Sequence, residues 1–380
     1  MQESKRFWCG VIYFWLWNWS IFGGYFLFFC PTLPLVILSP ILYRKWTDLV
    51  VTYWQFYITT LLKVIWGCKI RVTGDPIHTN ETVVLISNHR TRVDWNFLWP
   101  AMWHAVKDEG KIAYGTKYIL KEAIKHIPGA GWVMQLSFYL FINRNWERDQ
   151  NIMKSYVDYV AIHNYKHIMI IFPEGTDLTA KTKESSDRYA EKNGLPKYKH
   201  VLHPRTTGFM YLIEEMQKNK CVDAIYDVSL LYPDACPQNE KELFFTGRFP
   251  KTVLVHLVRY SVFDLPTTKE GLKNFLEQRW AEKEKTIQEY RSTGRFLHGD
   301  VLDSGTAPLS YLFAFFFWLV VPTFSFGLLF FSRTYRYIAL VHTALLLGLR
   351  FLPSGWQNFD VIAFKLRRVV FRFFWNKKIK

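Results

Sequence analysis

The sequence contains few of the residues from which disulfide frameworks and zinc sites are built. Its 380 residues include five cysteines, and this odd number cannot pair completely within one chain. None of them forms a CxxC pair, the spacing common in zinc and redox sites. These features indicate a reduced cytosolic or membrane setting, and we expect no metal ion. The cysteines are Cys9, Cys30, Cys68, Cys221 and Cys236.

Acidic residues are also scarce, and this shortage limits the classes of partner. The chain has 32 Asp and Glu against 48 Lys and Arg, and 18% of it is aromatic, including 16 Trp. Basic charge with many Trp and Tyr rings suits the headgroup zone of a bilayer, where the ring is buried and its polar edge stays wet. A nucleic-acid-binding protein is also basic but carries no long apolar stretches at both ends. We therefore expect a membrane partner and no nucleic acid.

No signal-peptide cleavage site follows the apolar run at the N-terminus, residues 7–42, which is also too long and aromatic for a cleaved leader. It can span a bilayer once, since about 20 apolar residues suffice. Prolines break its second half, so a re-entrant hairpin is an equal alternative, and basic residues on both sides fit a hairpin with cytosolic ends. Residues 49–66 predict an interfacial helix, or less favourably a span. Residues 1–66 thus form a membrane-embedded and interfacial region.

The C-terminal region, residues 301–380, is again apolar and then basic. Residues 311–331 can span a bilayer and residues 337–349 form a shorter run, which together predict a hairpin. After Asp360 no acidic residue occurs, which places the tail in the cytosol beside anionic lipid. The ending Lys377-Lys378-Ile379-Lys380 has the form of a di-lysine retrieval signal of the endoplasmic reticulum, or simply supplies lipid-facing charge. We expect a multi-pass protein of that membrane with a cytosolic active site.

The middle region, residues 67–300, predicts an α/β domain, and no internal repeat is visible. Apolar runs predict buried strands over residues 82–86, 137–142, 168–172, 224–231 and 253–260. Helices are predicted over residues 147–163, 208–218 and 268–290. Alternation of this kind favours helices packed on a largely buried sheet. Residues 174–200 form a long charged loop, which is either functional or mobile, or a solvated insertion.

A His–Asp pair is the sharpest chemical signal. His89 and Asp94 lie five positions apart in Asn88-His89-Arg90-Thr91-Arg92-Val93-Asp94-Trp95, at a predicted strand-to-helix junction. A turn there can fold the carboxylate back onto the imidazole. Asp94 would then accept from Nδ1–H and fix the tautomer, which leaves Nε2 able to take a proton from a hydroxyl. No Ser or Cys nucleophile is required, because the hydroxyl can belong to a substrate.

Three further polar clusters follow predicted strands. Phe172-Pro173-Glu174-Gly175-Thr176 forms a tight turn whose backbone N–H groups suit phosphate, with Glu174 as a polar anchor. Arg144, after Phe141-Ile142-Asn143, is a phosphate clamp or a surface ion-pair partner. Arg205 follows a predicted short strand at residues 201–202, beside His203, which is more often structural than catalytic in such a place. We expect these clusters to converge at one edge of the sheet.

These blocks, in this order, resemble those of the 1-acylglycerol-3-phosphate acyltransferase family. Within it, the chain looks most like the lysocardiolipin and lysophosphatidylinositol acyltransferase branch. The match to that branch lies in residues 88–95, in Glu174-Gly175-Thr176-Asp177-Leu178-Thr179, in residues 190–195 and in residues 201–209. Residues 70–290 carry the resemblance, and the membrane ends match only in character. Asn143 stands where the family often has Asp, and His203-Pro204-Arg205 departs from its Val-Pro pattern.

The resemblance implies a seven-stranded αβ-sandwich with an acyl-chain tunnel and membrane segments at both ends. It implies His89 as general base and Asp94 as its partner. It also implies substrate binding by the other residues of the blocks, with no cofactor beyond acyl-CoA as co-substrate. The expected acceptors are anionic lysophospholipids: lysophosphatidylinositol, lysocardiolipin and lysophosphatidylglycerol. The residues expected to bind substrate are Asn88, Arg92, Arg144, Glu174, Gly175, Thr176 and Arg205.

Two other functions remain open at this stage. One is acylation of lysophosphatidic acid or glycerol 3-phosphate in de novo phospholipid synthesis. The other is a lipid-binding or membrane-shaping protein with an idle site, which the intact set of His89, Asp94, Arg144 and Glu174 argues against. The sequence does not set the acyl-chain preference, the sn position or the oligomeric state.

Overall fold

The structure is a computed structural model that describes residues 2–107, 114–234, 236–295, 299–349, 351, 356, 361–363 and 366. The strands are β1 (Lys69–Gly74), β2 (Ile77–His78), β3 (Val83–Ser87), β4 (Val106–Lys107), β5 (Thr116–Lys121), β6 (Leu140–Ile142), β7 (Ile168–Ile171), β8 (Ala224–Leu231), β9 (Thr252–Ser261) and β10 (Val301–Leu302). The α-helices are α1 (Gln2–Gly24), α2 (Leu33–Leu38), α3 (Pro40–Thr60), α4 (Asp94–Ala105), α5 (Ala130–Leu136), α6 (Trp146–His163), α7 (Ala180–Lys192), α8 (Thr206–Lys218), α9 (Glu240–Phe245), α10 (Lys269–Thr293), α11 (Pro308–Phe331) and α12 (Arg333–Leu349).

A mixed sheet forms the centre of the molecule. Among the described residues it has eight strands in the order β10-β1-β9-β8-β3-β7-β5-β6, and β2 pairs separately with β4. Strands β8, β3, β7, β5 and β6 run parallel to one another, whereas β9 is antiparallel to β8. The carboxyl ends of β3, β6, β7 and β8 therefore meet at one edge. Ligand sites of α/β sheets lie at that edge.

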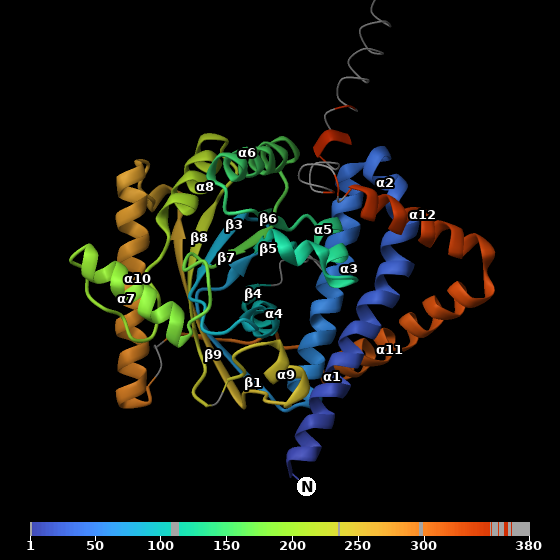
Figure 1. The fold of residues 1–380 in the computed structure, drawn as a ribbon, viewed down its shortest axis with the longest axis horizontal. Helices are drawn as coiled ribbons and strands as arrows, with labels where there is room; N and C mark the ends of the chain where they lie inside the picture. Colours follow the sequence, from blue (N-terminus) through green and yellow to red (C-terminus); the bar gives the residue numbers. More distant parts are fainter. Residues whose placement is uncertain are drawn as a thin grey trace, which may run out of the picture.

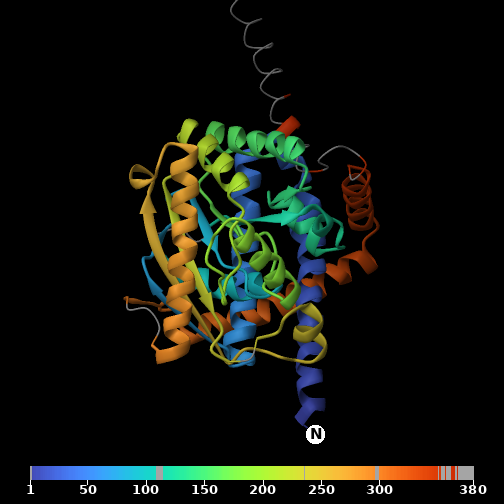
Figure 2. The ribbon, with the colours of Figure 1, turned by 60° about the vertical axis from the view of Figure 1, so that its left-hand side comes forward.

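Helices cover both faces of the sheet, which confirms the predicted α/β class. Alternate residues of the strands enter two separate cores, as the two-residue period of a strand requires. One core joins the sheet to α1, α3, α4 and α5, and the other joins it to α6, α8 and α10. Figure 1 shows these layers on opposite sides of the strands, and Figure 2 brings α10 to the front.

The N-terminal region is helical and packs against the sheet domain. Pro31 and Pro34 fall in the break between α1 and α3, where π-helical and 3-10 turns precede the short α2. Most side chains of α3 are buried. Its Asp48 accepts a hydrogen bond from the fully buried Lys117 of β5 at 2.6 Å. Residues 49–66 are thus largely helical, as predicted. Most of their side chains, however, are buried against the rest of the protein and do not face a membrane surface.

Helices α11 and α12 form the predicted C-terminal hairpin. α11 packs along α1 and α3, and α12 turns back from its end (Figure 1). Within the described residues, two stretches are long and apolar enough to cross a membrane, Glu3–Leu38 and Pro308–Phe331. The basic residues predicted to lie beside lipid and the ending 377–380 fall outside the described residues.

Three sequence predictions differ from the structure. Residues 174–200 are not a continuous loop, because they contain α7, whose start is fixed by a reciprocal capping bond between Thr179 and Thr182. Residues 201–202 form no strand. The strand predicted over residues 137–142 is shortened to β6, because α5 extends to Leu136 and Ser137 ends it. Strand β5 had no counterpart in the sequence prediction.

Candidate active site

The predicted His–Asp pair forms where β3 ends and α4 begins. His89 Nδ1 lies 2.9 Å from Asp94 Oδ2, so the imidazole donates its Nδ1 proton to the carboxylate. The Asp94 side chain is fully buried, whereas that of His89 is 16% exposed. In the part of the chain that the structure describes, His89 Nε2 has no hydrogen-bond partner. A buried carboxylate thus orients an imidazole whose second nitrogen faces outward, the geometry of a general base.

Two residues that the sequence did not single out complete the bonding of Asp94. Thr91 donates both its backbone N–H, at 3.0 Å, and its hydroxyl, at 3.1 Å. The hydroxyl of Tyr232, directly after β8, donates to Asp94 Oδ1 at 2.7 Å. Thr91 was detectable as a hydroxyl residue three positions before an acid at a helix start. Tyr232 was detectable only by noting that β8 ends at the same edge as β3.

Glu174 connects the loop between β3 and α4, which carries His89, to the domain interior. Its carboxylate is buried, and Oε1 accepts from the backbone N–H of His89 at 3.3 Å and from Trp280 Nε1 at 3.1 Å. Burial raises the pKa of Glu174 to about 8, and these hydrogen bonds together with one from the Leu202 backbone oppose that rise. The sequence placed Glu174 among the substrate-binding residues, whereas its contacts are with the protein.

Two arginines converge on Gly175. Arg144 donates from its guanidinium to the Gly175 carbonyl oxygen at 2.7 Å, and its own backbone has a φ of 64°. Arg205 lies so close that a Cβ on Gly175 would sit 3.2 Å from its Cδ, and Gly175 has a φ of +70°. Glycine is therefore required on both steric and conformational grounds. Neither guanidinium forms an ion pair with a described carboxylate, so both can bind an anion.

The other predicted site residues lie beside this centre. Asn88 is buried and exchanges two hydrogen bonds with the backbone of Leu230, which ties β3 to β8. Arg92 is exposed and pairs with Glu240 at 3.6 Å. Thr176 is half-buried next to Gly175. His203, the less favoured catalytic candidate, stacks on Tyr198 and contacts the Pro196 carbonyl oxygen.

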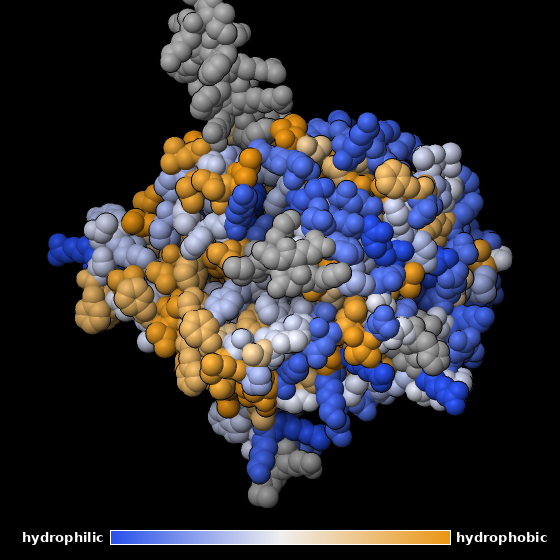
Figure 3. Space-filling model, turned by 180° about the vertical axis from the view of Figure 1, so that it is seen from behind, coloured by the Kyte–Doolittle hydropathy of each residue, from blue (hydrophilic) through white to orange (hydrophobic). Residues whose placement is uncertain are grey.

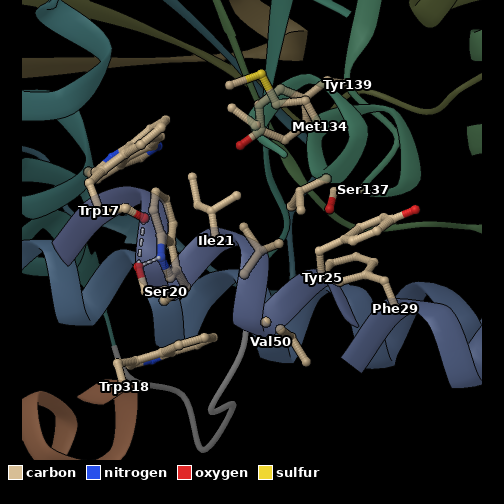
Figure 4. A pocket seen from close by; sticks show the side chains of 16 residues that line it. Trp17, Ser20, Ile21, Tyr25, Phe29, Val50, Met134, Ser137, Tyr139 and Trp318 are labelled. Atoms are coloured by element: carbon tan, nitrogen blue, oxygen red, sulfur yellow. Dashed lines mark hydrogen bonds between the residues drawn. The ribbon is translucent and has the colours of Figure 1, made fainter. Parts of the chain in front are cut away.

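An apolar pocket lies between the sheet domain and the N- and C-terminal helices. Figure 4 shows Ile21 of α1 and Tyr25, the first residue after α1, facing Met134 and Tyr139 across it. Aromatic rings connect it to the catalytic loop: Phe172 stacks on His89 with centroids 4.2 Å apart, and Tyr118 links Phe172 to Tyr139. In the described part of the chain, no cluster of three or more His, Cys, Asp or Glu could hold a metal ion.

Sequence comparison assigns this arrangement to a family. Residues 69–232 match the family described as Acyltransferase, and residues 244–318 match Acyltransferase C-terminus. The chain is 41% identical over 280 residues to lysocardiolipin acyltransferase 1 of Gallus gallus, covering 73% of this chain and 71% of the relative. The chain belongs to the acyltransferase family.

Further relatives of this acyltransferase agree with that assignment. It is 31% identical to lysophosphatidylinositol acyltransferase 10 of Caenorhabditis elegans over 330 residues, 83% of each chain. The crystal structure of the 1-acyl-sn-glycerophosphate acyltransferase PlsC from Thermotoga maritima superimposes with a TM-score of 0.50 at 15% identity. That match covers 78% of this chain and all of the bacterial one, and it shows a shared fold. The first family match contains the His–Asp pair and both arginines, and the second contains α10.

Proposed function

We propose that this acyltransferase moves the acyl group of acyl-CoA onto a free hydroxyl of an anionic lysophospholipid, with His89 as general base. The observation that carries the proposal is the contact of 2.9 Å between His89 and a fully buried Asp94, with the outward side of the imidazole open. A hydroxyl needs such a base to become a nucleophile. Two arginines that pair with no described carboxylate contact the neighbouring turn at Gly175, where the acceptor's phosphate would bind.

The reaction needs only one proton-transfer group. His89 Nε2 takes the proton of the acceptor hydroxyl while its oxygen attacks the thioester carbonyl carbon. The tetrahedral oxyanion collapses, the carbon–sulfur bond breaks, and the imidazolium returns the proton to the CoA thiolate. Buried Asp94 stabilises the imidazolium while it exists. The proposal includes no cofactor, because the imidazole takes and returns the same proton.

The apolar pocket supports the acyl part of the proposal. Its walls include Trp, Ile and Val side chains of α1, α3, α4, α5 and α11 together with Tyr25 and Tyr139, and α1 and α11 also carry exposed apolar surface. An acyl chain held there would reach the catalytic loop along Tyr139, Tyr118 and Phe172. Burial of each methylene contributes about 0.8 kcal/mol, so such a pocket favours long chains.

The same surface supports membrane attachment. The outer face of α11 is almost entirely apolar, and Figure 3 shows such side chains gathered on the side formed by α11 and α12. An exposed apolar patch of this kind on a basic protein favours a bilayer. We propose a multi-pass protein of the endoplasmic reticulum membrane with a cytosolic active site, which the basic tail also favours. The most exposed residues of this face include Leu309, Phe313, Phe316, Val320, Phe324, Phe330 and Phe331.

The names of the relatives favour lysophosphatidylinositol and lysocardiolipin as acceptors, and lysophosphatidylglycerol shares their phosphodiester chemistry. Lysophosphatidic acid is the second candidate, because a relative in Arabidopsis thaliana is named probable 1-acyl-sn-glycerol-3-phosphate acyltransferase 5 at 30% identity. The arginines beside Gly175 would bind a phosphate monoester as well.

A panel of lysolipids tests the proposal. Membranes containing the protein receive labelled acyl-CoA with each acceptor in turn, and the phospholipid product is measured. We expect turnover with the phosphodiester lysolipids and a loss of about 10²–10⁴-fold in His89→Ala, the share of a general base. Preference for lysophosphatidic acid would select the second candidate, and wild-type rates in His89→Ala would reject the mechanism.

A further inference from the structure

Helix α10 lies on the opposite face of the sheet from the apolar pocket (Figure 2), yet its side chains bond to Glu174 and to the segment that precedes Arg205. We propose that Trp280 and Glu284 of α10 are positioning residues for the reaction. Trp280 holds the His89 loop, and Glu284 holds the segment that carries Arg205. This inference rests on the proposed function of His89 and assigns a task to the region matched by the C-terminal family.

The first of the two contacts of α10, made by Trp280, acts through Glu174. The Trp280 side chain is fully buried, so it cannot touch a substrate. Its Nε1 donates to Glu174 Oε1, the same oxygen that accepts the backbone N–H of His89. The indole therefore fixes the carboxylate that fixes the start of the His89 loop. Without that donor, Glu174 can rotate and release the His89 N–H from its present position.

A buried ion pair anchors α10 at this level. Lys283 pairs with Asp227 of β8, and both side chains are buried. Burial lowers the pKa of Lys283 well below its usual value, and the Glu174 carboxyl group opposes this shift, which places the two groups near each other. The distance between Trp280 and Glu174 is thus set by a helix bound to the central sheet. Breaking a buried pair by removing one partner is strongly destabilising, so neither partner is suited to a functional test.

The second contact of α10, made by Glu284, is with backbone N–H groups. The buried Glu284 carboxylate accepts from three consecutive N–H groups: Lys199 at 2.6 Å, His200 at 2.8 Å and Val201 at 3.2 Å. Three converging N–H groups form an anion-binding nest, here filled by a side chain of the same protein. Downstream in this segment, the Arg205 N–H donates to the Pro173 carbonyl oxygen. Glu284 therefore supports the approach to the arginine pair at Gly175.

Substitutions that weaken these two contacts should cause different kinetic defects. Trp280→Phe removes one donor to the carboxylate that positions His89, so kcat falls while the KM values of both substrates stay near wild type. The loss of one hydrogen bond corresponds to about three- to tenfold. Glu284→Gln loses part of the nest and loosens the arginine segment, so the KM of the anionic acceptor rises several-fold with kcat nearly unchanged.

Matched controls separate positioning from general damage. Trp46→Phe also removes an indole N–H from a hydrogen bond, to the Phe28 carbonyl oxygen at 2.8 Å. Glu289→Gln changes an exposed carboxylate on the same helix. Both controls should keep wild-type kinetics. Thermal unfolding of each variant in detergent shows whether it is folded, and Trp280→Tyr serves as a second variant if Trp280→Phe does not fold.

A double-mutant cycle completes the test. Steady-state rates with acyl-CoA and lysophosphatidylinositol in mixed micelles are measured for Trp280→Phe, Glu174→Ala and their combination. We expect the combination to match Glu174→Ala, because the indole acts only through that carboxylate. Additive losses, or a KM effect in Trp280→Phe, would overturn the inference. His89→Ala is run alongside: an active His89→Ala rejects the proposed mechanism, whereas an inactive one with wild-type Trp280→Phe rejects the role of α10 alone.

Discussion

Two His–Asp pairs lie at opposite ends of α4, and they differ in which partner is buried. At its start, His89 faces outward and the Asp94 side chain is fully buried. At its end, the side chain of His104 is 4% exposed and that of Asp303 is 68% exposed, with 3.0 Å between Nδ1 and the carboxylate. Distance alone does not distinguish them. The pair with the buried acid leaves its imidazole accessible, as the proposed role of a base requires, whereas the pair with the buried imidazole connects α4 to the residues before α11.

The surroundings of the two imidazoles sharpen the difference. Nδ1 of His89 has Asp94 as its hydrogen-bond partner, which fixes the tautomer. Nδ1 of His104 is shared between Asp303 and both the backbone N–H and the hydroxyl of Ser304. Its Nε2 is buried without a partner among the described residues. A substrate hydroxyl cannot reach such a nitrogen, so His104 has no access to proton transfer.

The largest effect that separates the two pairs is expected from the acids. Asp94→Asn replaces the acceptor of the Nδ1 proton with an amide that no longer selects the tautomer. Activity should fall by about 10²–10⁴-fold, as for other orienting carboxylates. Asp303→Asn, the matched change in the other pair, should keep wild-type activity. Equal losses in the two variants, measured as acyl transfer in membranes, would contradict the division of roles.

A smaller effect is expected from the support of Asp94. Tyr232→Phe removes one hydroxyl from a buried carboxylate that retains two bonds from Thr91. We expect kcat to fall by about three- to tenfold, the value of one such hydrogen bond. Tyr57→Phe is the control, because the buried Tyr57 hydroxyl has no partner in the described part of the structure. If both variants have wild-type kcat, Tyr232 does not position the acid.

The smallest effect on activity is expected at His104, where stability should change instead. Burial lowers the pKa of His104, the nearby Lys63 lowers it further, and Asp303 opposes both. The folded state therefore binds the His104 proton less readily than the unfolded state does. The stability that comes from keeping His104 neutral is present above about pH 6.5 and is lost as pH falls below that value.

Thermal unfolding of His104→Gln between pH 7.5 and pH 5 checks this. The variant should lose about 1 kcal/mol at pH 7.5, the value of one hydrogen bond, and decline less than wild type at low pH. A steeper decline than wild type would show that the sign is wrong. Buried His167 and His256 also have lowered pKa values, so the comparison of the two proteins carries the result rather than either curve alone.

The sequence predicted the elements with strong periodicity. β8 has its predicted bounds, and α6, α8, α10, β3, β7 and β9 differ by a few residues at most. Their apolar residues recur with the period of a strand or helix, because one face of each element packs against the core. A local stretch of sequence therefore shows the pattern. β5 was missed because it includes Lys117 and Lys121, and only the tertiary contact with Asp48 of α3 makes the first of these lysines tolerable in a core. α7 was missed because its sequence is charged and mostly exposed.

The candidate site divides in the same way. Residue types and spacing predicted His89, Asp94, Arg144, Gly175 and Arg205 as site residues, because chemistry of this kind requires particular side chains near particular turns. The supporting residues were not identified, since nothing local relates Trp280 to a loop more than a hundred residues earlier. The direction of the Glu174 carboxylate is a similar case: its sequence position suits a ligand contact, but its packed neighbours point it into the protein.

By itself, the sequence determined the chemical groups of this acyltransferase, the order of its blocks and the apolar character of its ends. These follow from residue type and local periodicity. Only the tertiary structure decided which of two His–Asp pairs is open, that α3 lies inside the protein, and that α10 bonds to Glu174 and to the segment before Arg205. Burial and hydrogen-bond partners come from segments far apart in the chain, and they decide whether an imidazole acts as a base or as a structural contact.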